Sequence, residues 1–175
     1  MGSTVWLTGL SGAGKSTLAK ALASALRQKG QPCHIVDGDE LRSGLCSDLG
    51  FGREDRAENI RRAAEVCRIL NASGVVAIAA LISPYQSDRE MARRIVGPAS
   101  FHEVWLSTPL AVCEQRDPKG LYLKARRGEI ARFTGVSDPY EVPQAPSLVL
   151  DTGSVSLQEC VARLAQWPAI RGVLK

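Results

Sequence analysis

The chain has 175 residues, of which 45% are hydrophobic and 23% are charged, and its formal net charge is +4. This length suits one domain with a buried core, and no apolar run approaches the ~18 residues that a membrane span requires. The modest charge and the lack of a clustered basic run argue against nucleic-acid binding. The five cysteines lack metal-ligand spacing and no signal peptide precedes the first apolar run, so we expect a cytoplasmic protein.

Apolar runs and turn residues predict strands that alternate with helices. Strands are expected over 4–8, 33–36, 75–82, 101–106 and 148–150. Helices are expected from the glycine-rich turn to 29, then over 53–73, from after 85 to 96, and over 110–115, 121–127 and 157–167, the last ending at Pro168. This alternation is typical of an α/β fold in which helices cover both faces of a mainly parallel, five-stranded sheet.

The segment 117–146 is polar and contains several glycines and prolines. It is longer than most passive connections between elements. We therefore expect a lid-like segment, with the short helix 121–127 inside it, belonging to a single domain that spans residues 1–175.

The stretch from Gly9 to Ser16 reads Gly-Leu-Ser-Gly-Ala-Gly-Lys-Ser and lies between a predicted strand and a predicted helix. This is the P-loop pattern, in which glycines let backbone N–H groups surround phosphate oxygens. Lys15 would contact the β- and γ-phosphates, and the Ser16 hydroxyl would bind Mg²⁺. We therefore predict a P-loop NTPase fold. The expected ATP-binding residues are Gly9, Leu10, Ser11, Gly12, Ala13, Gly14, Lys15, Ser16 and Thr17.

Ligands of such sheets collect at the carboxyl ends of the strands. Asp37 and Asp39 follow the second predicted strand, and Ser83 follows the third. Beside a triphosphate, one carboxylate can accept the proton of an attacking hydroxyl while the other holds a water of the magnesium shell. We expect Asp37 to be catalytic and both aspartates to meet the metal through water. Alternatively, or in addition, Asp39 caps a helix that begins at Glu40.

Two of the three phenylalanines, Phe51 and Phe133, lie in polar loops that contain glycine. An aromatic ring in such a loop can stack on a purine, or it can plug a small hydrophobic cluster under the loop. Arg56 and Asn59 share one face of a predicted helix and can meet one ligand, although a solvated basic face is the ordinary alternative.

Taken together, these motifs resemble the adenylylsulfate kinase (APS kinase) family over nearly the whole chain. The resemblance rests on the P-loop, on Asp-Gly-Asp at 37–39 and on Leu-Gly-Phe at 49–51. It continues in Glu-Asp-Arg-Ala-Glu-Asn-Ile-Arg-Arg at 54–62, Ile-Ser-Pro-Tyr at 82–85, Cys-Glu-Gln-Arg-Asp-Pro-Lys-Gly-Leu-Tyr at 113–122, Phe-Thr-Gly at 133–135 and Asp-Pro-Tyr-Glu at 138–141.

The resemblance implies that the γ-phosphate of MgATP is transferred to the 3′-hydroxyl of adenosine 5′-phosphosulfate. The products would be 3′-phosphoadenosine 5′-phosphosulfate and ADP, which is the activation step of sulfate assimilation. In the family, two loop aromatics enclose the acceptor's adenine, and here these positions are Phe51 and Phe133. The other implied acceptor contacts are Asp39, Arg42, Arg56, Asn59, Ile82, Ser83 and Lys119. The implied partners are ATP and the phosphosulfate, and a homodimer is compatible with the resemblance.

The Ser83 position is commonly described in the family as a phosphoserine intermediate. A serine hydroxyl needs an activating base, and the sequence offers no evident histidine partner. Direct attack by the acceptor's hydroxyl requires only positioning and charge neutralisation. We therefore expect Ser83 to position the acceptor.

Two alternatives remain open. A small P-loop kinase for a nucleoside monophosphate, a sugar acid or an antibiotic hydroxyl would differ only in its acceptor pocket. A GTP-dependent switch protein would carry Asn-Lys-x-Asp for guanine, which the sequence lacks, and its Asp-x-x-Gly would follow a strand, whereas the match at 117–120 follows a predicted helix.

Overall fold

The computed structural model describes residues 2–166, and the predicted helix end at Trp167 and Pro168 lies outside this range. Five parallel strands form one sheet in the order β2-β3-β1-β4-β5. Their bounds are β1 Thr4–Thr8, β2 Cys33–Asp37, β3 Val76–Ala80, β4 Phe101–Leu106 and β5 Leu148–Leu150. The helices are α1 Lys15–Gln28, α2 Gly38–Ser43, α3 Arg53–Ala72, α4 Gln86–Val96, α5 Leu110–Arg116, α6 Leu121–Arg126 and α7 Leu157–Gln166. The predicted α/β fold with a five-stranded parallel sheet is confirmed.

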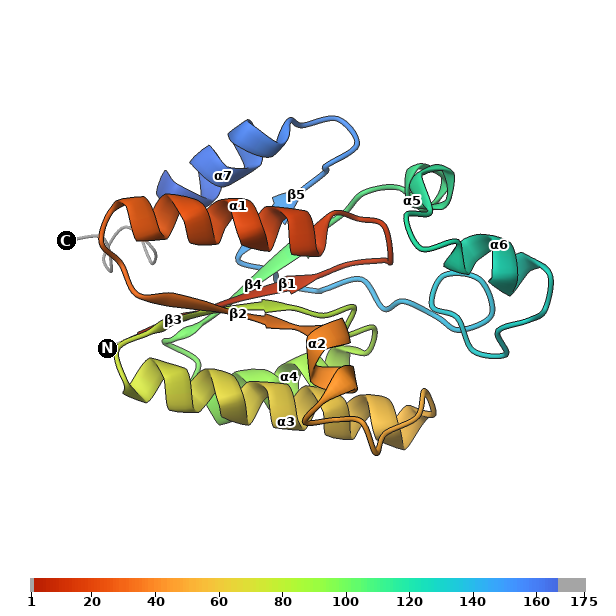
Figure 1. Ribbon diagram of the computed structural model, residues 1–175, viewed down its shortest axis with the longest axis horizontal. Coiled ribbons are helices and arrows are strands. Elements are labelled where there is room, and N and C mark those ends of the chain that lie inside the picture. Colours follow the sequence, from red (N-terminus) through yellow and green to blue (C-terminus); the bar gives the residue numbers. More distant parts are fainter. Residues whose placement is uncertain (1, 167–175) are drawn as a thin grey trace.

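The central strands are buried on both faces. Every residue of β1 and β3 is buried, and Leu7 of β1 lies opposite Ala80 of β3 and Val104 of β4. Such unbroken apolar strands need cover on both sides. Helices α1 and α7 cover one face, and α3 and α4 cover the other (Figure 1).

Each covering helix contributes an apolar stripe. Leu18, Leu22 and Leu26 of α1 face the sheet at a spacing of four residues. On the opposite face, Trp6 of β1 packs against Phe101 of β4, with ring centroids 5.4 Å apart. The hydrophobic clusters on the two faces of the sheet therefore fix the positions of the strand ends and of the loops that follow them.

Two local predictions need correction. The third strand ends at Ala80 rather than at residue 82, because the chain turns through Ser83, whose φ is 42°. The cap of the helix after β2 is Asp37, not Asp39: α2 begins at Gly38, and the extended Asp37 accepts a hydrogen bond from the Asp39 N–H at 2.9 Å.

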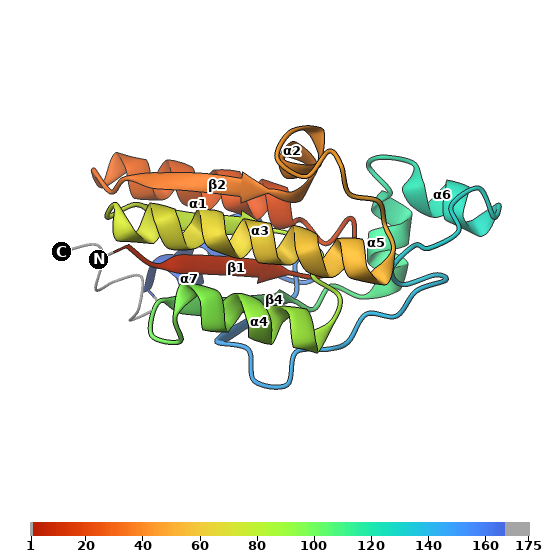
Figure 2. The same ribbon diagram turned by 90° about the horizontal axis from the view of Figure 1, so that it is seen from below.

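The first part of the segment 117–146, which contains α6, projects beyond the carboxyl ends of the strands, and its last part runs back beside the sheet to β5, as Figure 2 shows from a second direction. All five cysteines are free thiols; four are buried and Cys33 is half-buried. Within residues 2–166, no helix is long and apolar enough to cross a membrane.

Candidate functional site

A cavity of about 800 Å³ lies at the carboxyl ends of the strands. Its lining comes from the P-loop, the Asp-Gly-Asp turn, the Phe51 loop, the Ser83 turn, the first turns of α3 and parts of the segment 118–134. One continuous space therefore joins a phosphate-binding loop to both predicted aromatic loops.

The P-loop backbone depends on its glycines. Gly12 has a φ of 77°, and a Cβ added there would stand 2.8 Å from the Cys113 carbonyl oxygen. Any larger residue would force the loop away from α5. The loop is therefore shaped by close packing as well as by its own turn.

Lys15 is folded back onto the loop that carries it. Its Nζ donates hydrogen bonds to the Gly9 carbonyl at 2.8 Å and to the Leu10 carbonyl at 2.7 Å. Burial lowers the pKa of its ammonium from 10.5 to about 8. A triphosphate entering the loop would offer this cation a stronger, charged acceptor.

The two aspartates after β2 face different neighbours. Asp37 accepts the Ser16 hydroxyl at 2.6 Å, so the first turn of α1 and the end of β2 meet directly. Asp39 forms an ion pair with Lys119, which belongs to the segment 117–146. The Asp-Gly-Asp turn thus touches the P-loop helix with one carboxylate and the predicted lid with the other.

Ser83 is only 2% exposed, and its hydroxyl is held by neutral groups. Its Oγ accepts the indole N–H of Trp6 at 3.1 Å and donates to the Leu81 carbonyl at 3.3 Å. Neither partner can act as a general base, so nothing bonded to this hydroxyl activates it as a nucleophile.

The two loop aromatics lie in different surroundings. Phe51 is 59% exposed, and the guanidinium of Arg42 lies 4.2 Å from its ring centroid. Phe133 is 7% exposed and packs edge-on against Tyr122 at 4.9 Å. Phe133 therefore belongs to the hydrophobic core as well as to the cavity wall, whereas Phe51 is not a buried plug.

Arg56 joins the loops that carry these two rings. Its Nε donates to the Phe51 carbonyl at 2.9 Å, its Nη2 to the Arg132 carbonyl at 2.9 Å, and its Nη1 to Thr134 Oγ1 at 3.3 Å. The side chain is buried, so the solvated basic face offered as an alternative is wrong for Arg56. The exposed Arg61, by contrast, pairs with Glu58 on the same helix.

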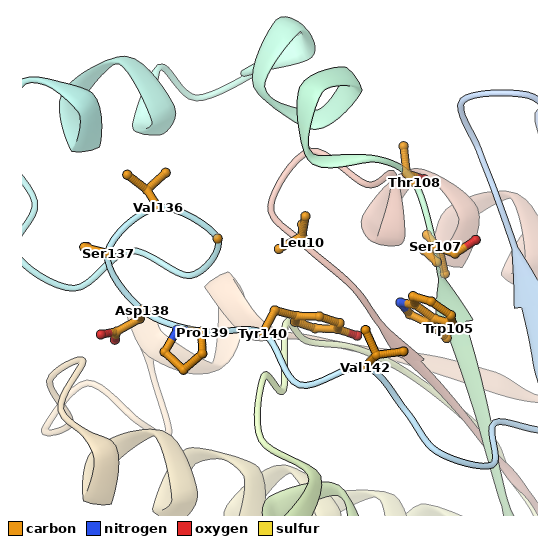
Figure 3. Close-up of a pocket in the computed structure, with 12 residues that line it drawn as sticks. Leu10, Trp105, Ser107, Thr108, Val136, Ser137, Asp138, Pro139, Tyr140 and Val142 are labelled. Atoms are coloured by element: carbon orange, nitrogen blue, oxygen red, sulfur yellow. The ribbon is translucent and has the colours of Figure 1, made fainter.

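Most of the predicted site residues line the cavity. They are Ser11, Gly12, Gly14, Lys15, Ser16, Thr17, Asp37, Asp39, Arg42, Phe51, Arg56, Asn59, Ile82, Ser83, Lys119 and Phe133. Gly9, Leu10 and Ala13 do not line it. Ala13 is buried, and Leu10 faces a second pocket of about 600 Å³ between β4 and residues 135–142, drawn in Figure 3.

Two further residues support the P-loop and were not predicted. Arg116 donates to the Gly12 carbonyl at 3.2 Å and to Thr152 Oγ1 at 2.9 Å. Thr152 in turn donates to the Ala13 carbonyl at 2.8 Å. Thr152 lies just after the carboxyl end of β5, a position that the strand-end rule could have singled out.

Comparisons with known proteins point to a single kinase family. The family model described as adenylylsulphate kinase matches residues 1–151. The adenylyl-sulfate kinase of Bacteroides fragilis is 56% identical over 165 residues, which cover 94% of this chain and 82% of the relative. That of Marinobacter nauticus is 50% identical over 171 residues, covering 98% and 86%.

A solved structure gives the same result. The Mycobacterium tuberculosis APS kinase CysC in complex with AMPPNP and APS aligns with a TM-score of 0.92 at 45% identity, covering 95% of this chain and 96% of that one. The family match, the close relatives and the P-loop kinase fold agree. This chain is therefore a kinase that belongs to the adenylylsulphate kinase family.

Proposed function

We propose that this chain transfers the γ-phosphate of ATP to the 3′-hydroxyl of adenosine 5′-phosphosulfate. The observation that carries the proposal is the single cavity that joins the P-loop to Phe51 and Phe133. The mycobacterial relative, whose structure contains AMPPNP and APS, supports the same pair of ligands.

The P-loop end of the cavity would hold the triphosphate. Lys15 would leave the carbonyls of Gly9 and Leu10 for the β- and γ-phosphates, because a hydrogen bond to a charged acceptor is stronger than one to a neutral carbonyl. Arg116 and Thr152 would keep the loop backbone in place through their hydrogen bonds to its carbonyl groups.

Mg²⁺ fits this donor set. Within residues 2–166, no three His, Cys, Asp or Glu side chains gather into a cage, and the hydrogen-bonded Ser16 hydroxyl and Asp37 carboxylate both belong to residues that line the cavity with the P-loop. Magnesium suits one or two such ligands completed by water and phosphate oxygens. When bound, the ion would neutralise charge on the transferring phosphate.

The other end would hold the acceptor between the two aromatic loops. Phe51 and Phe133 would enclose the adenine, and Arg42 already lies against the Phe51 ring. Arg56 would keep both loops in register, and its remaining N–H groups would meet the phosphosulfate. Asn59, Ile82, Lys119 and Asp39 would complete the pocket.

Transfer would proceed in one step. The acceptor's 3′-oxygen forms a bond to the γ-phosphorus while the bond from that phosphorus to the bridging oxygen of ADP breaks. Asp37 orients the attacking hydroxyl and receives its proton. Ser83, bonded to an indole N–H, positions the acceptor and forms no phosphoserine.

The segment 117–146 would act as a lid. Lys119 already reaches Asp39 across the cavity, which brings the beginning of the segment to the Asp-Gly-Asp turn. A homodimer and a cytoplasmic location stay predictions, and light scattering after gel filtration would test the former.

The deciding experiment is ADP release from MgATP with low micromolar adenosine 5′-phosphosulfate. The controls are AMP, a sugar acid, and GTP in place of ATP. ADP formed only with the phosphosulfate and matched by 3′-phosphorylated product supports the proposal. Turnover with another acceptor would favour a different small P-loop kinase, and preferential GTP binding would favour a switch protein.

A further inference from the structure

Arg89 is a charged side chain inside the protein, on α4, and only 1% of it is exposed. Its Nε pairs with Oε1 of the buried Glu103 of β4 at 2.8 Å. Burial raises the pKa of the Glu103 carboxyl, and the neighbouring guanidinium opposes that rise. Buried ion pairs add little net stability because desolvation offsets their attraction. The pair with Glu103 therefore does not by itself account for a buried arginine, and the other hydrogen bonds of the guanidinium indicate its role.

The rest of the guanidinium connects two segments of the cavity region. Nη1 donates to the Ser83 carbonyl at 2.7 Å. Nη2 donates to the Glu141 carbonyl at 2.7 Å and to Gln86 Oε1 at 2.7 Å. One side chain therefore links β4, the Ser83 turn and the distal end of the segment 117–146.

The Ser83 turn needs such support. A φ of 42° is unfavourable for a residue with a Cβ and persists only where the surroundings hold it. The Trp6 indole holds the Ser83 side chain and Arg89 holds its carbonyl. The Ser83 turn is thus fixed from both sides.

The distal end of the segment 117–146 is attached to the same turn. The Glu141 N–H donates to the Pro84 carbonyl at 2.8 Å, and Glu141 Oε2 accepts the Gln86 N–H at 2.6 Å. The Tyr140 hydroxyl shares a hydrogen bond with Thr8 Oγ1 at 2.9 Å. Figure 3 shows the Tyr140 ring reaching from this segment toward β4.

We propose that Arg89 is a positioning residue that fixes the Ser83 turn and the distal end of the segment 117–146 relative to each other, so that the acceptor pocket is formed before the acceptor binds. The assignment rests on the proposed function for its effect on catalysis. None of the hydrogen-bond partners of Arg89 belongs to the P-loop, so ATP binding should not depend on it.

The test compares three variants of the full chain. Arg89→Met with Glu103→Met removes the guanidinium and leaves no unpaired buried charge. Glu103→Gln weakens the ion pair but leaves the bonds to Ser83 and Glu141. Arg94→Met, on an exposed residue of the same helix, is the matched control.

In the double variant, kcat/KM for adenosine 5′-phosphosulfate should fall by about tenfold or more while the Kd for ATP changes by less than about twofold. Trypsin should cleave the segment 117–146, which has exposed basic residues such as Lys124 and Arg132, about tenfold faster. Glu103→Gln should lower the melting temperature but leave kcat/KM and the rate of trypsin cleavage near those of the unmodified protein. Arg94→Met should change nothing.

Several outcomes would overturn the assignment. These are unchanged kcat/KM and cleavage in the double variant, an equal loss of ATP affinity, or an equal loss of function in Glu103→Gln. If the double variant does not fold, Arg89→Lys decides, because an ammonium keeps the charge beside Glu103 but cannot also span the carbonyls of Ser83 and Glu141. Wild-type-like behaviour of Arg89→Lys in both assays would then refute the role.

The two proposals fail in different ways. If the unmodified protein does not phosphorylate adenosine 5′-phosphosulfate, the proposed function is wrong. The trypsin experiment needs no substrate, so its result still tests the role of Arg89.

Discussion

Replacing each loop phenylalanine by alanine should separate acceptor binding from stability. Phe133 is 7% exposed and packs edge-on against Tyr122 at 4.9 Å, whereas Phe51 is 59% exposed. Removing a buried phenylalanine side chain costs about 3–5 kcal/mol, part of which is the aromatic pair. At roughly 2–4 °C per kcal/mol for a chain of this size, a loss of about 3 kcal/mol lowers the melting temperature of Phe133→Ala by roughly 6–12 °C.

Phe51→Ala should cost at most about 1 kcal/mol of stability, since the exposed ring loses its close cation–π contact with Arg42 and a more distant one with Arg56. If both rings enclose the acceptor's adenine, each variant should nevertheless weaken acceptor binding by ~1–3 kcal/mol, or about 5- to 150-fold. Thermal unfolding and calorimetric titration with adenosine 5′-phosphosulfate measure the two effects.

The pattern of results is what tests the reasoning. A Phe133→Ala protein that melts like the unmodified one would show that this ring is not packed in the core. Unchanged acceptor affinity in Phe51→Ala would remove that ring from the acceptor pocket. A loss of ATP affinity in either variant would contradict the division of the cavity into two ends.

Three further outcomes are expected. Asp37→Ala should lower kcat by about 10²-fold or more with little change in acceptor affinity, and stopped-flow assays that show unchanged turnover would exclude a catalytic role. Because the pKa of Lys15 is lowered to about 8, the unliganded protein loses this charge as the pH rises through that value, while bound phosphate would restore it. ATP affinity should therefore decline above about pH 8, with proton uptake on binding detected by calorimetry in two buffers, and Lys15→Arg should abolish the pH dependence. Transfer with a chirally labelled γ-phosphate should invert its configuration, and retention would revive a phosphoserine at Ser83.

The fold and the phosphate site could be predicted because their signals are local. The P-loop lies within eight successive residues, and the apolar runs of β1 and β3 directly predict central strands. The error in the predicted cap has the same origin. Asp37 and Asp39 are only two residues apart, and the sequence allows either of them to cap the helix that follows β2. The extended backbone of Asp37 in the structure identifies it as the cap.

The supports of the site could not be predicted because they join distant parts of the chain. Arg56 and Thr134 are 78 positions apart, and Arg116 and Thr152 are 36 apart. A sequence pattern can indicate that an arginine lies near a ligand, but it does not say which carbonyls its guanidinium will meet. The motif therefore predicts the residues around the reacting groups, and the tertiary structure shows what keeps those residues in place.

The half-buried Cys33 offers a labelling site for following conformational change in this protein. It begins β2, while Asp37 at the other end of the same strand lines the cavity, so the thiol lies roughly 13 Å away along the strand. The other four thiols are buried, and burial raises the pKa of Cys67 to about 12. Burial raises the pKa of Cys33 as well, so a fluorophore should react with Cys33 faster than with the buried thiols because Cys33 is more accessible. Paired with a second dye at a residue of the segment 117–146 outside the cavity lining, it would test in real time whether this segment closes as proposed.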